Sequence, residues 1–262
     1  MNTPSPVRSE WSGAVARIQL DSPSNRNALS HEMLVRLSRE IERASSDPTI
    51  RVLVLGHTGP SFCSGADLRE QTAARGSGAS TPGVGALIPL FKAILDSPKP
   101  VVCAVGGAAR AGGLGLVAAC DIAIAGGSAT FATSEVRIGV APAVLSVVAL
   151  LKLGRSAAAD LFLTGRVIGA EEARAVGLVA QAVPDEQLGE AVEATVQRLL
   201  LAHPNALAAA KRILAHVPNL SREQAFREMT ELSASLFASP EAQEGMAAFM
   251  ERRPPGWAKS PG

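Results

Sequence analysis

Tyrosine is absent from the 262-residue chain, and aromatic residues make up only 3% of it. Surfaces that stack nucleic-acid bases are built from aromatic side chains, and surfaces that follow phosphates are strongly basic. Here the formal net charge is only +1, and no basic stretch is interleaved with aromatics. We therefore expect no nucleic-acid partner.

Cysteine is scarce as well, and its pattern bears on the compartment. Cys63, Cys103 and Cys120 are odd in number, form no Cys-x-x-Cys pair and lie in apolar surroundings, which is typical of reduced, buried thiols. Residues 1–11 lack the apolar core of a signal peptide, and glycine, proline or charge interrupts the long apolar stretches. The sequence predicts a soluble cytoplasmic protein without a membrane partner.

Several catalytic signatures are also missing. The chain has no G-x-S-x-G motif and no P-loop ending in GK[ST]. Its four histidines are scattered without the i, i+4 spacing of a metal-binding helix, so we expect no metal. Among them, His57 lies beside a glycine-containing turn, where a polar loop role is favoured over that of a base.

The sequence does contain alternating strand and helix patterns up to Pro184. Strands are predicted at residues 13–20, 50–55, 101–105 and 121–125, and helices at 30–44, 87–95, 143–153, 156–163 and 170–176. Ser30 and Ser156 are expected to cap two of these helices, and residues 71–85 to form a loop. From residue 185 to 251 only amphipathic helix follows, interrupted at prolines. This pattern predicts an α/β core with an α-helical C-terminal region.

The segment ARAGGLGLVAACD, residues 109–121, begins a predicted helix with glycines, although glycine is a poor helix former. A helix start carries unpaired N–H groups and a partial positive charge, and glycine lets a ligand approach them closely. Such a site binds phosphate or stabilises a developing oxyanion.

Two alternatives compete with an oxyanion site. Residues 113–118 match the dinucleotide fingerprint G-x-G-x-x-A, and Glu135 lies near the distance of a ribose-binding acid. However, the first glycine of that fingerprint should end the strand, whereas residues 106–112 separate Val105 from Gly113. The other alternative is close helix–strand packing at small residues.

Two further segments are compatible with an oxyanion site. The stretch SGADL, residues 64–68, follows a strand and offers a second N–H donor, although alone it also fits an Asx-type turn. Glu135 lies in a nearly apolar context, where partial desolvation would raise the pKa of its carboxyl group, as a general acid/base requires. The alternative is a surface glutamate paired with Arg137.

Taken together, these segments resemble the crotonase family, the enoyl-CoA hydratase/isomerase superfamily. Six stretches carry the resemblance in order: SPSNRNALS (22–30), RVLVLGHTGPSFCSGADL (51–68), KPVVCAVGGAARAGGLGLVAACDIAIA (99–125), ATFATSEVRIGVAPA (129–143), LTGRVIGAEEARAVGLV (163–179) and SPEAQEGMAAFMERRPPGW (239–257).

The resemblance implies a crotonase-type spiral of ββα units, with a catalytic core at residues 1–200 and an α-helical oligomerisation region at 201–262. It implies a homotrimer or hexamer, a coenzyme A thioester as substrate and no separate cofactor. The N–H groups of Ala66 and Gly112 would hold the thioester oxygen, and Glu135 would be the acid/base. The implied substrate contacts are Arg26, Ala28, Ser64, Asp67, Leu68, Arg69, Gly113 and Gly115, with Arg69 at a phosphate and residues 71–85 beside the acyl group.

One departure leaves the reaction open. Relatives with two acids carry the first one where this chain has Gly115, and only the second, Glu135, is present. A single carboxyl group suits an enoyl-CoA isomerase, which moves a proton from C2 to C4. The segments at 112–125 and 133–147 nevertheless resemble a bacterial branch that hydrates methylglutaconyl-type CoA esters. We expect a hydratase first, an isomerase second, and an acyl-CoA-binding scaffold with vestigial activity third.

Overall fold

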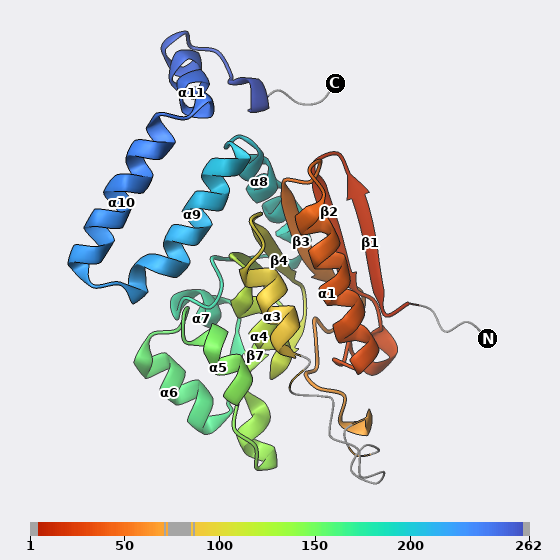
Figure 1. Ribbon diagram of the computed structural model, residues 1–262. Coiled ribbons are helices and arrows are strands. Elements are labelled where there is room, and N and C mark those ends of the chain that lie inside the picture. The colour runs from red at the N-terminus through yellow and green to blue at the C-terminus, as the bar shows by residue number, and fades with distance from the viewer. Residues whose placement is uncertain (1–4, 71, 73–84, 86, 259–262) are drawn as a thin grey trace.

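In the computed structural model, residues 5–70, 72, 85 and 87–258 are described, and strands and helices alternate before a helical end (Figure 1). The strands are β1 (Val7–Ser12), β2 (Val15–Leu20), β3 (Val52–His57), β4 (Val101–Val105), β5 (Ala108–Arg110), β6 (Ile122–Gly126), β7 (Thr130–Ala132), β8 (Ile168–Gly169) and β9 (Gln181–Val183). The helices are α1 (His31–Ser46), α3 (Leu87–Leu95), α4 (Gly112–Ala119), α5 (Ala143–Ala149), α6 (Arg155–Thr164), α7 (Ala170–Ala175), α8 (Leu188–Leu200), α9 (Pro204–His216), α10 (Arg222–Phe237) and α11 (Pro240–Met250). Short 3₁₀ helices include η1 (Pro23–Asn25), η2 (Ser134–Ile138), η3 (Asp185–Gln187), η4 (Val217–Asn219) and η5 (Gly256–Ala258). The loop predicted at residues 71–85 lies almost wholly outside the described residues.

The main sheet has the strand order β1-β2-β3-β4-β6-β9, and only β1 runs antiparallel to its neighbour. Strand β3 shows how the sheet is buried on both faces, because successive side chains point to opposite sides. Leu53 and Leu55 join the core cluster beneath α1 and α3, whereas Val52 and Val54 join the cluster beneath α8. Near-continuous apolar strands are therefore required here.

Helix α1 forms where the sequence predicts it. The Ser30 hydroxyl accepts a hydrogen bond from the Met33 N–H at 3.2 Å, which caps the helix start. Met33, Leu34, Leu37 and Ile41 recur at helical spacing and are buried against the sheet.

Two successive parts of the chain repeat one path. Strand β4 enters the main sheet, β5 enters a small sheet with the order β5-β7-β8, and α4 follows. Strand β6 then enters the main sheet and β7 the small sheet, and η2 and α5 follow. This repeated strand–strand–helix path confirms the predicted spiral of ββα units.

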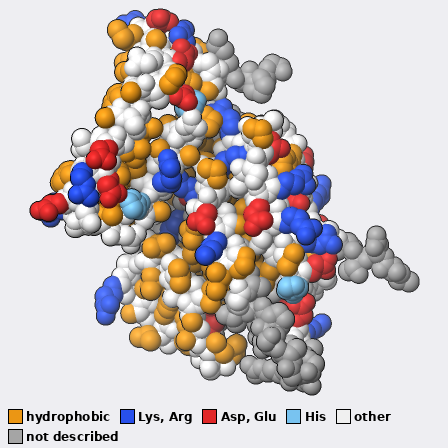
Figure 2. Space-filling view, viewed as in Figure 1, with side chains coloured by type: hydrophobic (Ala, Val, Ile, Leu, Met, Phe, Trp, Pro, Cys, Tyr) orange, Lys and Arg blue, Asp and Glu red, His pale blue; other side chains and the backbone are white. Residues whose placement is uncertain are grey.

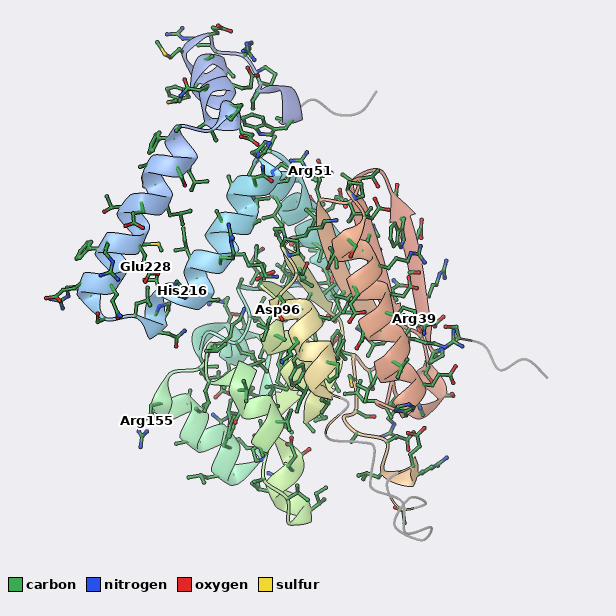
Figure 3. All side chains as sticks on the ribbon, viewed as in Figure 1. Arg39, Arg51, Asp96, Arg155, His216 and Glu228 are labelled. Atoms are coloured by element: carbon green, nitrogen blue, oxygen red, sulfur yellow. The ribbon has the colours of Figure 1, made fainter. Side chains whose placement is uncertain are left out.

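Burial decreases along the C-terminal helices from α8 to α10. Helix α8 packs on the main sheet, and α9 is attached by Lys211, whose Nζ lies 2.8 Å from Asp121 Oδ2. Arg51 donates hydrogen bonds to the carbonyl oxygens of Leu200, Ala202 and Trp257 at 2.8, 2.6 and 2.9 Å (Figure 3). No residue of α10 is buried. The division at residues 200/201 stays a prediction.

Some local expectations were wrong or incomplete. Helix α6 begins at Arg155 with Gly154 as its N-cap and no side-chain cap, so Ser156 lies inside the helix. Strand β1 was not predicted, because it is an edge strand whose residues between Val7 and Trp11 are exposed and polar. Strands β5 and β7 were missed because each has only three residues.

The state of the cysteines agrees with the sequence analysis. Cys63, Cys103 and Cys120 are all buried free thiols, as predicted. Within the described ranges, no helix combines the length and the apolar character needed to cross a membrane.

Candidate active site

Three predicted site residues come from parallel chain segments that lie side by side. Cys63 pairs with Ala109 in a parallel bridge, and Ala109 pairs with Phe131 in the parallel ladder of β5 and β7. Ala66 lies three residues beyond Cys63, Gly112 three beyond Ala109, and Glu135 four beyond Phe131. Because parallel segments end at the same edge of a sheet, the register places all three residues at one edge.

The Ala66 N–H group is directed away from its neighbouring strand. Leu29 and Ala66 form a parallel β-bridge, but the two backbone hydrogen bonds of Leu29 join it to Gly65 and Asp67, the neighbours of Ala66. The Leu29 N–H donates to the Gly65 carbonyl at 2.8 Å, and the Asp67 N–H donates to the Leu29 carbonyl at 3.4 Å. In a parallel pair, the residue between such bonds turns its own N–H to the other side.

Gly112 is the first residue of α4, so its N–H is among those that have no acceptor within the helix. The preceding Ala111 adopts φ +51° and ψ −123°, a conformation that residues other than glycine rarely take. Its N–H donates to the Ala132 carbonyl at 3.0 Å, which fixes this turn onto β7. Backbone strain of this kind costs about 1–3 kcal/mol and clusters at functional sites. No feature of the sequence pointed to Ala111.

Two glycines let the donor segments approach each other. At Gly65, where φ is +92°, an added Cβ would lie 2.9 Å from the Ala111 Cβ. At Gly113, an added Cβ would lie 2.7 Å from both the Cβ and the carbonyl oxygen of Cys63. The close packing expected at Gly113 is therefore present. The two N–H groups form a candidate oxyanion hole.

Glu135 lies in η2, immediately after the small sheet, and is half-buried. Its Oε2 atom is buried and has no hydrogen-bond partner among the described residues. Burial raises the pKa of this carboxyl group, and a hydrogen bond with its own backbone opposes the rise. Arg137 donates instead to the Thr164 carbonyl at 3.3 Å, and no ion pair with Glu135 is found in the described part of the chain. Glu135 is therefore a half-buried carboxyl group with a raised pKa and one oxygen that has no partner among the described residues.

Gly115 faces apolar side chains. An added Cβ would lie 2.6 Å from Phe91 Cζ and 3.0 Å from Leu145 Cβ. Both side chains are almost fully buried, with exposed fractions of 4% and 3%. Phe91 and Leu145 therefore fill the space beside Gly115, the position that the family resemblance assigns to the first acid of two-acid relatives.

The predicted coenzyme A contacts lie around the Ala66 segment. The Ser64 N–H donates to the Arg26 carbonyl at 3.1 Å, which joins the stretch at residues 22–30 to the donor loop. Ala28 is buried, whereas Arg26, Leu68 and Arg69 are exposed.

Asp67 has a structural role in the same loop. Its Oδ1 accepts from the N–H groups of Arg69 at 3.0 Å and Glu70 at 3.4 Å, so it caps the helical turn that begins at Leu68. The contacts of these side chains with substrate stay predictions.

Two polar side chains, those of His57 and Asn27, hold backbone segments that lead to the site. His57 Nε2 accepts from the Gly106 N–H at 3.0 Å, and burial lowers the pKa of the imidazole, so the ring is neutral and structural. Sequence reasoning missed Asn27, which is buried. Its Oδ1 accepts from the Ser22 N–H at 2.7 Å, and its Nδ2 donates to the carbonyls of Thr58 and Ser61 at 3.0 and 2.8 Å. The available signal was an asparagine in the connection between the predicted strand at 13–20 and the predicted helix at 30–44.

A model of the enoyl-CoA hydratase/isomerase family matches residues 10–260. The chain belongs to this family. It is 34% identical to the enoyl-CoA hydratase EchA19 of Mycobacterium tuberculosis, over 95% of this chain and 94% of that protein. It is 30% identical to the 2,3-dehydroadipyl-CoA hydratase of Escherichia coli, over 92% and 94%. The crystal structure of an enoyl-CoA hydratase/isomerase from Marinobacter aquaeolei superposes with a TM-score of 0.91 at 31% identity, covering 97% of this chain and 99% of that one.

Family membership and topology both argue against a dinucleotide-binding site at the glycine segment. Strand β5 lies between β4 and α4 and belongs to the small sheet, so the glycines do not join a main-sheet strand directly to its helix. The fingerprint geometry requires that direct connection.

Replacing Gly115 with glutamate should lower stability without adding hydratase activity. The new side chain must displace Phe91 and Leu145, and overpacking of this kind costs about 1–3 kcal/mol before the cost of burying a carboxylate. Urea unfolding and turnover of a 2-enoyl-CoA measure the two effects. Gly189→Glu is the matched control, because an added Cβ at Gly189 meets nothing within 4 Å. A stable Gly115→Glu enzyme with a higher rate would show that a second acid fits.

Replacing Glu135 with glutamine should lower turnover by about 10²–10⁴-fold, the usual contribution of a general acid/base. In the wild type, the raised pKa of Glu135 should shift the acidic limb of the pH–rate profile above the range of an ordinary glutamate.

The same variant should be more stable than the wild type at neutral pH. A carboxyl group whose pKa is raised on folding destabilises the folded state once pH exceeds that pKa. The difference should shrink as pH falls toward about 4.3, where the unfolded glutamate also takes up its proton. Glu171→Gln, at a side chain that is 75% exposed, is the control. If Glu135→Gln and the wild type turned over substrate at equal rates, Glu135 would not be the acid/base of the reaction.

Proposed function

We propose that this chain is a coenzyme A thioester enzyme that stabilises an enolate and moves protons with one glutamate. The observation that supports the proposal most strongly is the unpartnered Oε2 of Glu135 at the same edge as the N–H groups of Ala66 and Gly112. Donors aimed at a developing oxyanion and a carboxyl group with a raised pKa are the two elements that enolate chemistry needs. The buried free thiols fit a reducing cytoplasm.

The leading reaction is hydration of a 2-enoyl-CoA. The Glu135 carboxylate accepts a proton from a water molecule while the water oxygen bonds to C3. The thioester becomes an enolate whose oxygen is held by the N–H groups of Ala66 and Gly112. Glu135 then returns the proton to C2, which gives the 3-hydroxyacyl thioester. Loss of one oxyanion donor would cost about 3 kcal/mol of barrier. Relatives named as hydratases support this reaction.

Double-bond migration is the second candidate, and the wall at Gly115 favours it. Phe91 and Leu145 place no polar group beside Gly115 that could hold a water molecule. In this reaction, the Glu135 carboxylate takes a proton from C2 of a 3-enoyl-CoA. The carboxylic acid returns the proton to C4, while the same N–H pair holds the dienolate oxygen.

Substrate binding is proposed at the donor loop. The exposed Arg26 and Arg69 side chains can meet phosphates of coenzyme A, since guanidinium groups pair well with phosphate. The backbone at Ser64 and Leu68, beside Ala28 and Asp67, can face the adenine, and Gly113 and Gly115 can lie near the acyl end.

Two substrates should separate the candidate reactions in one assay with purified wild type. A hydratase converts a short 2-enoyl-CoA to the 3-hydroxyacyl ester, with one solvent oxygen incorporated from labelled water. An isomerase converts the 3-enoyl-CoA to the 2-enoyl ester without oxygen uptake. Mass spectrometry of the products reports both outcomes. Tight binding of both esters with no turnover would instead identify a scaffold and contradict the enzymatic proposal.

We further propose that copies of the chain assemble through the C-terminal helices. Phe226 and Phe237 on α10 are 71% and 63% exposed, and Phe249 on α11 is 84% exposed. Figure 2 shows hydrophobic side chains on these helices and over the α5–α6 part of the same face. Exposed apolar surface of this extent marks an interaction site.

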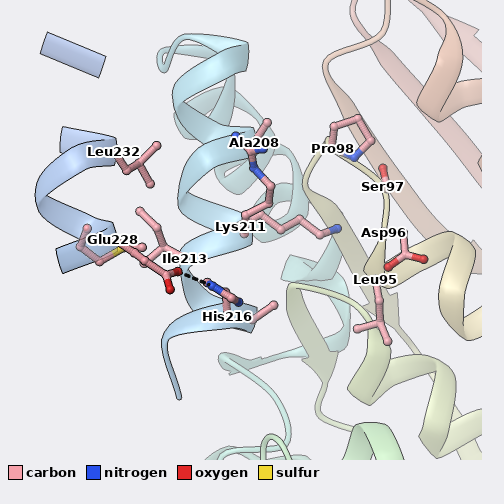
Figure 4. A pocket seen from close by; sticks show the side chains of 13 residues that line it. Leu95, Asp96, Ser97, Pro98, Ala208, Lys211, Ile213, His216, Glu228 and Leu232 are labelled. Atoms are coloured by element: carbon pink, nitrogen blue, oxygen red, sulfur yellow. Dashed lines mark hydrogen bonds and ion pairs between the residues drawn. The ribbon is translucent and has the colours of Figure 1, made fainter. Parts of the chain in front are cut away.

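The hollow beside α10 is consistent with an assembly. A cavity of about 850 Å³ lies between α9, α10 and the segment after α3. His216 Nε2 lies 2.9 Å from Glu228 Oε2 across the α9–α10 hairpin, as Figure 4 shows. In a trimer or hexamer, the α9–α10 hairpin can pack against another copy without changing its own conformation.

The double variant Phe226→Asp/Phe237→Asp should therefore dissociate the assembly without unfolding the chain, since neither ring is buried in a single copy. Sedimentation velocity should give a trimer or hexamer for the wild type and a smaller species for the variant. Glu231→Ala, at an exposed polar position of the same helix, is the control. A monomeric wild type would contradict the proposed assembly.

A further inference from the structure

Phe91 is the residue that closes the site at Gly115. It lies in the middle of α3, and its ring tip reaches α4 at the position where a Cβ of residue 115 would sit. One helical turn earlier, Leu87 Cδ1 lies 3.4 Å from the corresponding Cβ position of Gly112. The inner face of α3 therefore covers the first turn of α4, where the oxyanion donor is found.

On its other side, Phe91 borders an apolar groove. A cavity of about 550 Å³ runs between α3 and α5, with Ile88, Phe91 and Leu95 on one wall. Val144, Val147 and Val148 form the other wall, and Lys92 and Asp96 complete the lining with Ala143. The cavity is large enough for several methylene groups, and its lining is mostly hydrocarbon.

Phe91 thus lines the groove and also lies against Gly115, on the helix that begins with the donor Gly112. In the proposed reactions, the carbons next to the thioester lie between Glu135 and Gly115. A straight acyl chain directed from there past α4 meets the Phe91 ring, which leaves no space for even a methyl group on Gly115. Removing the ring would connect the two spaces.

We propose that Phe91 limits the length of the acyl chain, by separating the catalytic site from the groove between α3 and α5. The wild type is thereby restricted to short acyl groups along this path, and truncation of Phe91 admits an unbranched tail into the groove. This inference rests on the proposed function, since it takes an acyl-CoA as the ligand.

The test measures dissociation constants of butanoyl-CoA and decanoyl-CoA by titration calorimetry. Both esters are saturated, so the measurement does not depend on which reaction the enzyme performs. Phe91→Ala should shift the ratio of the two constants toward decanoyl-CoA by at least about tenfold, which is equivalent to about 1.4 kcal/mol. Phe91→Leu keeps most of the core volume and should shift it less, in the same direction. Adding Val144→Trp to Phe91→Ala should refill the groove and abolish the shift.

Leu90→Ala is the matched control. Leu90 is fully buried on the same helix but does not line the groove, so its loss should leave the ratio unchanged. An unchanged ratio in folded Phe91→Ala and Phe91→Leu, or an equal shift in Leu90→Ala, would overturn the inference and leave the proposed function standing. If the wild type binds neither ester, the proposed function itself is overturned, and the inference with it.

Discussion

The parallel pairing of Cys63, Ala109 and Phe131 is the constraint on which the site depends. These residues belong to segments that are distant in the sequence, yet their register sets the heights of Ala66, Gly112 and Glu135. The register therefore places two backbone donors and one carboxyl group at the same edge of the sheet. A slip of one residue in this register would turn each segment by one face and separate the three groups.

The convergence carries an energetic cost that other interactions offset. Ala111 is held in a strained conformation, and the Glu135 carboxyl group is partly desolvated without a partner. The ladder of β5 and β7, the hydrogen bond from Ala111 to Ala132 and the buried amide of Asn27 hold these segments in place. Local strain and an unpaired polar atom are tolerated here because the surrounding core determines the backbone.

Sequence reasoning predicted most of the long elements, because hydrophobic period and capping are local signals. Helices α1 and α3 and strand β4 lie where the pattern placed them. Short strands such as β5 gave no periodic signal, and neither did the strain at Ala111, since both are set by tertiary pairing. The family resemblance predicted Ala66, Gly112 and Glu135 as a set, and the strand register places the three residues at one edge.

The single carboxyl group is accompanied by apolar surroundings at Gly115. At the position that the resemblance assigns to a first acid, this chain has Gly115 with Phe91 and Leu145 packed against it. A glycine alone would leave a hole, and a hole of that size would admit water or collapse. The two apolar side chains remove it and make the wall hydrophobic. In the proposed function, proton transfer rests on Glu135 alone, and Phe91 limits the length of the acyl chain.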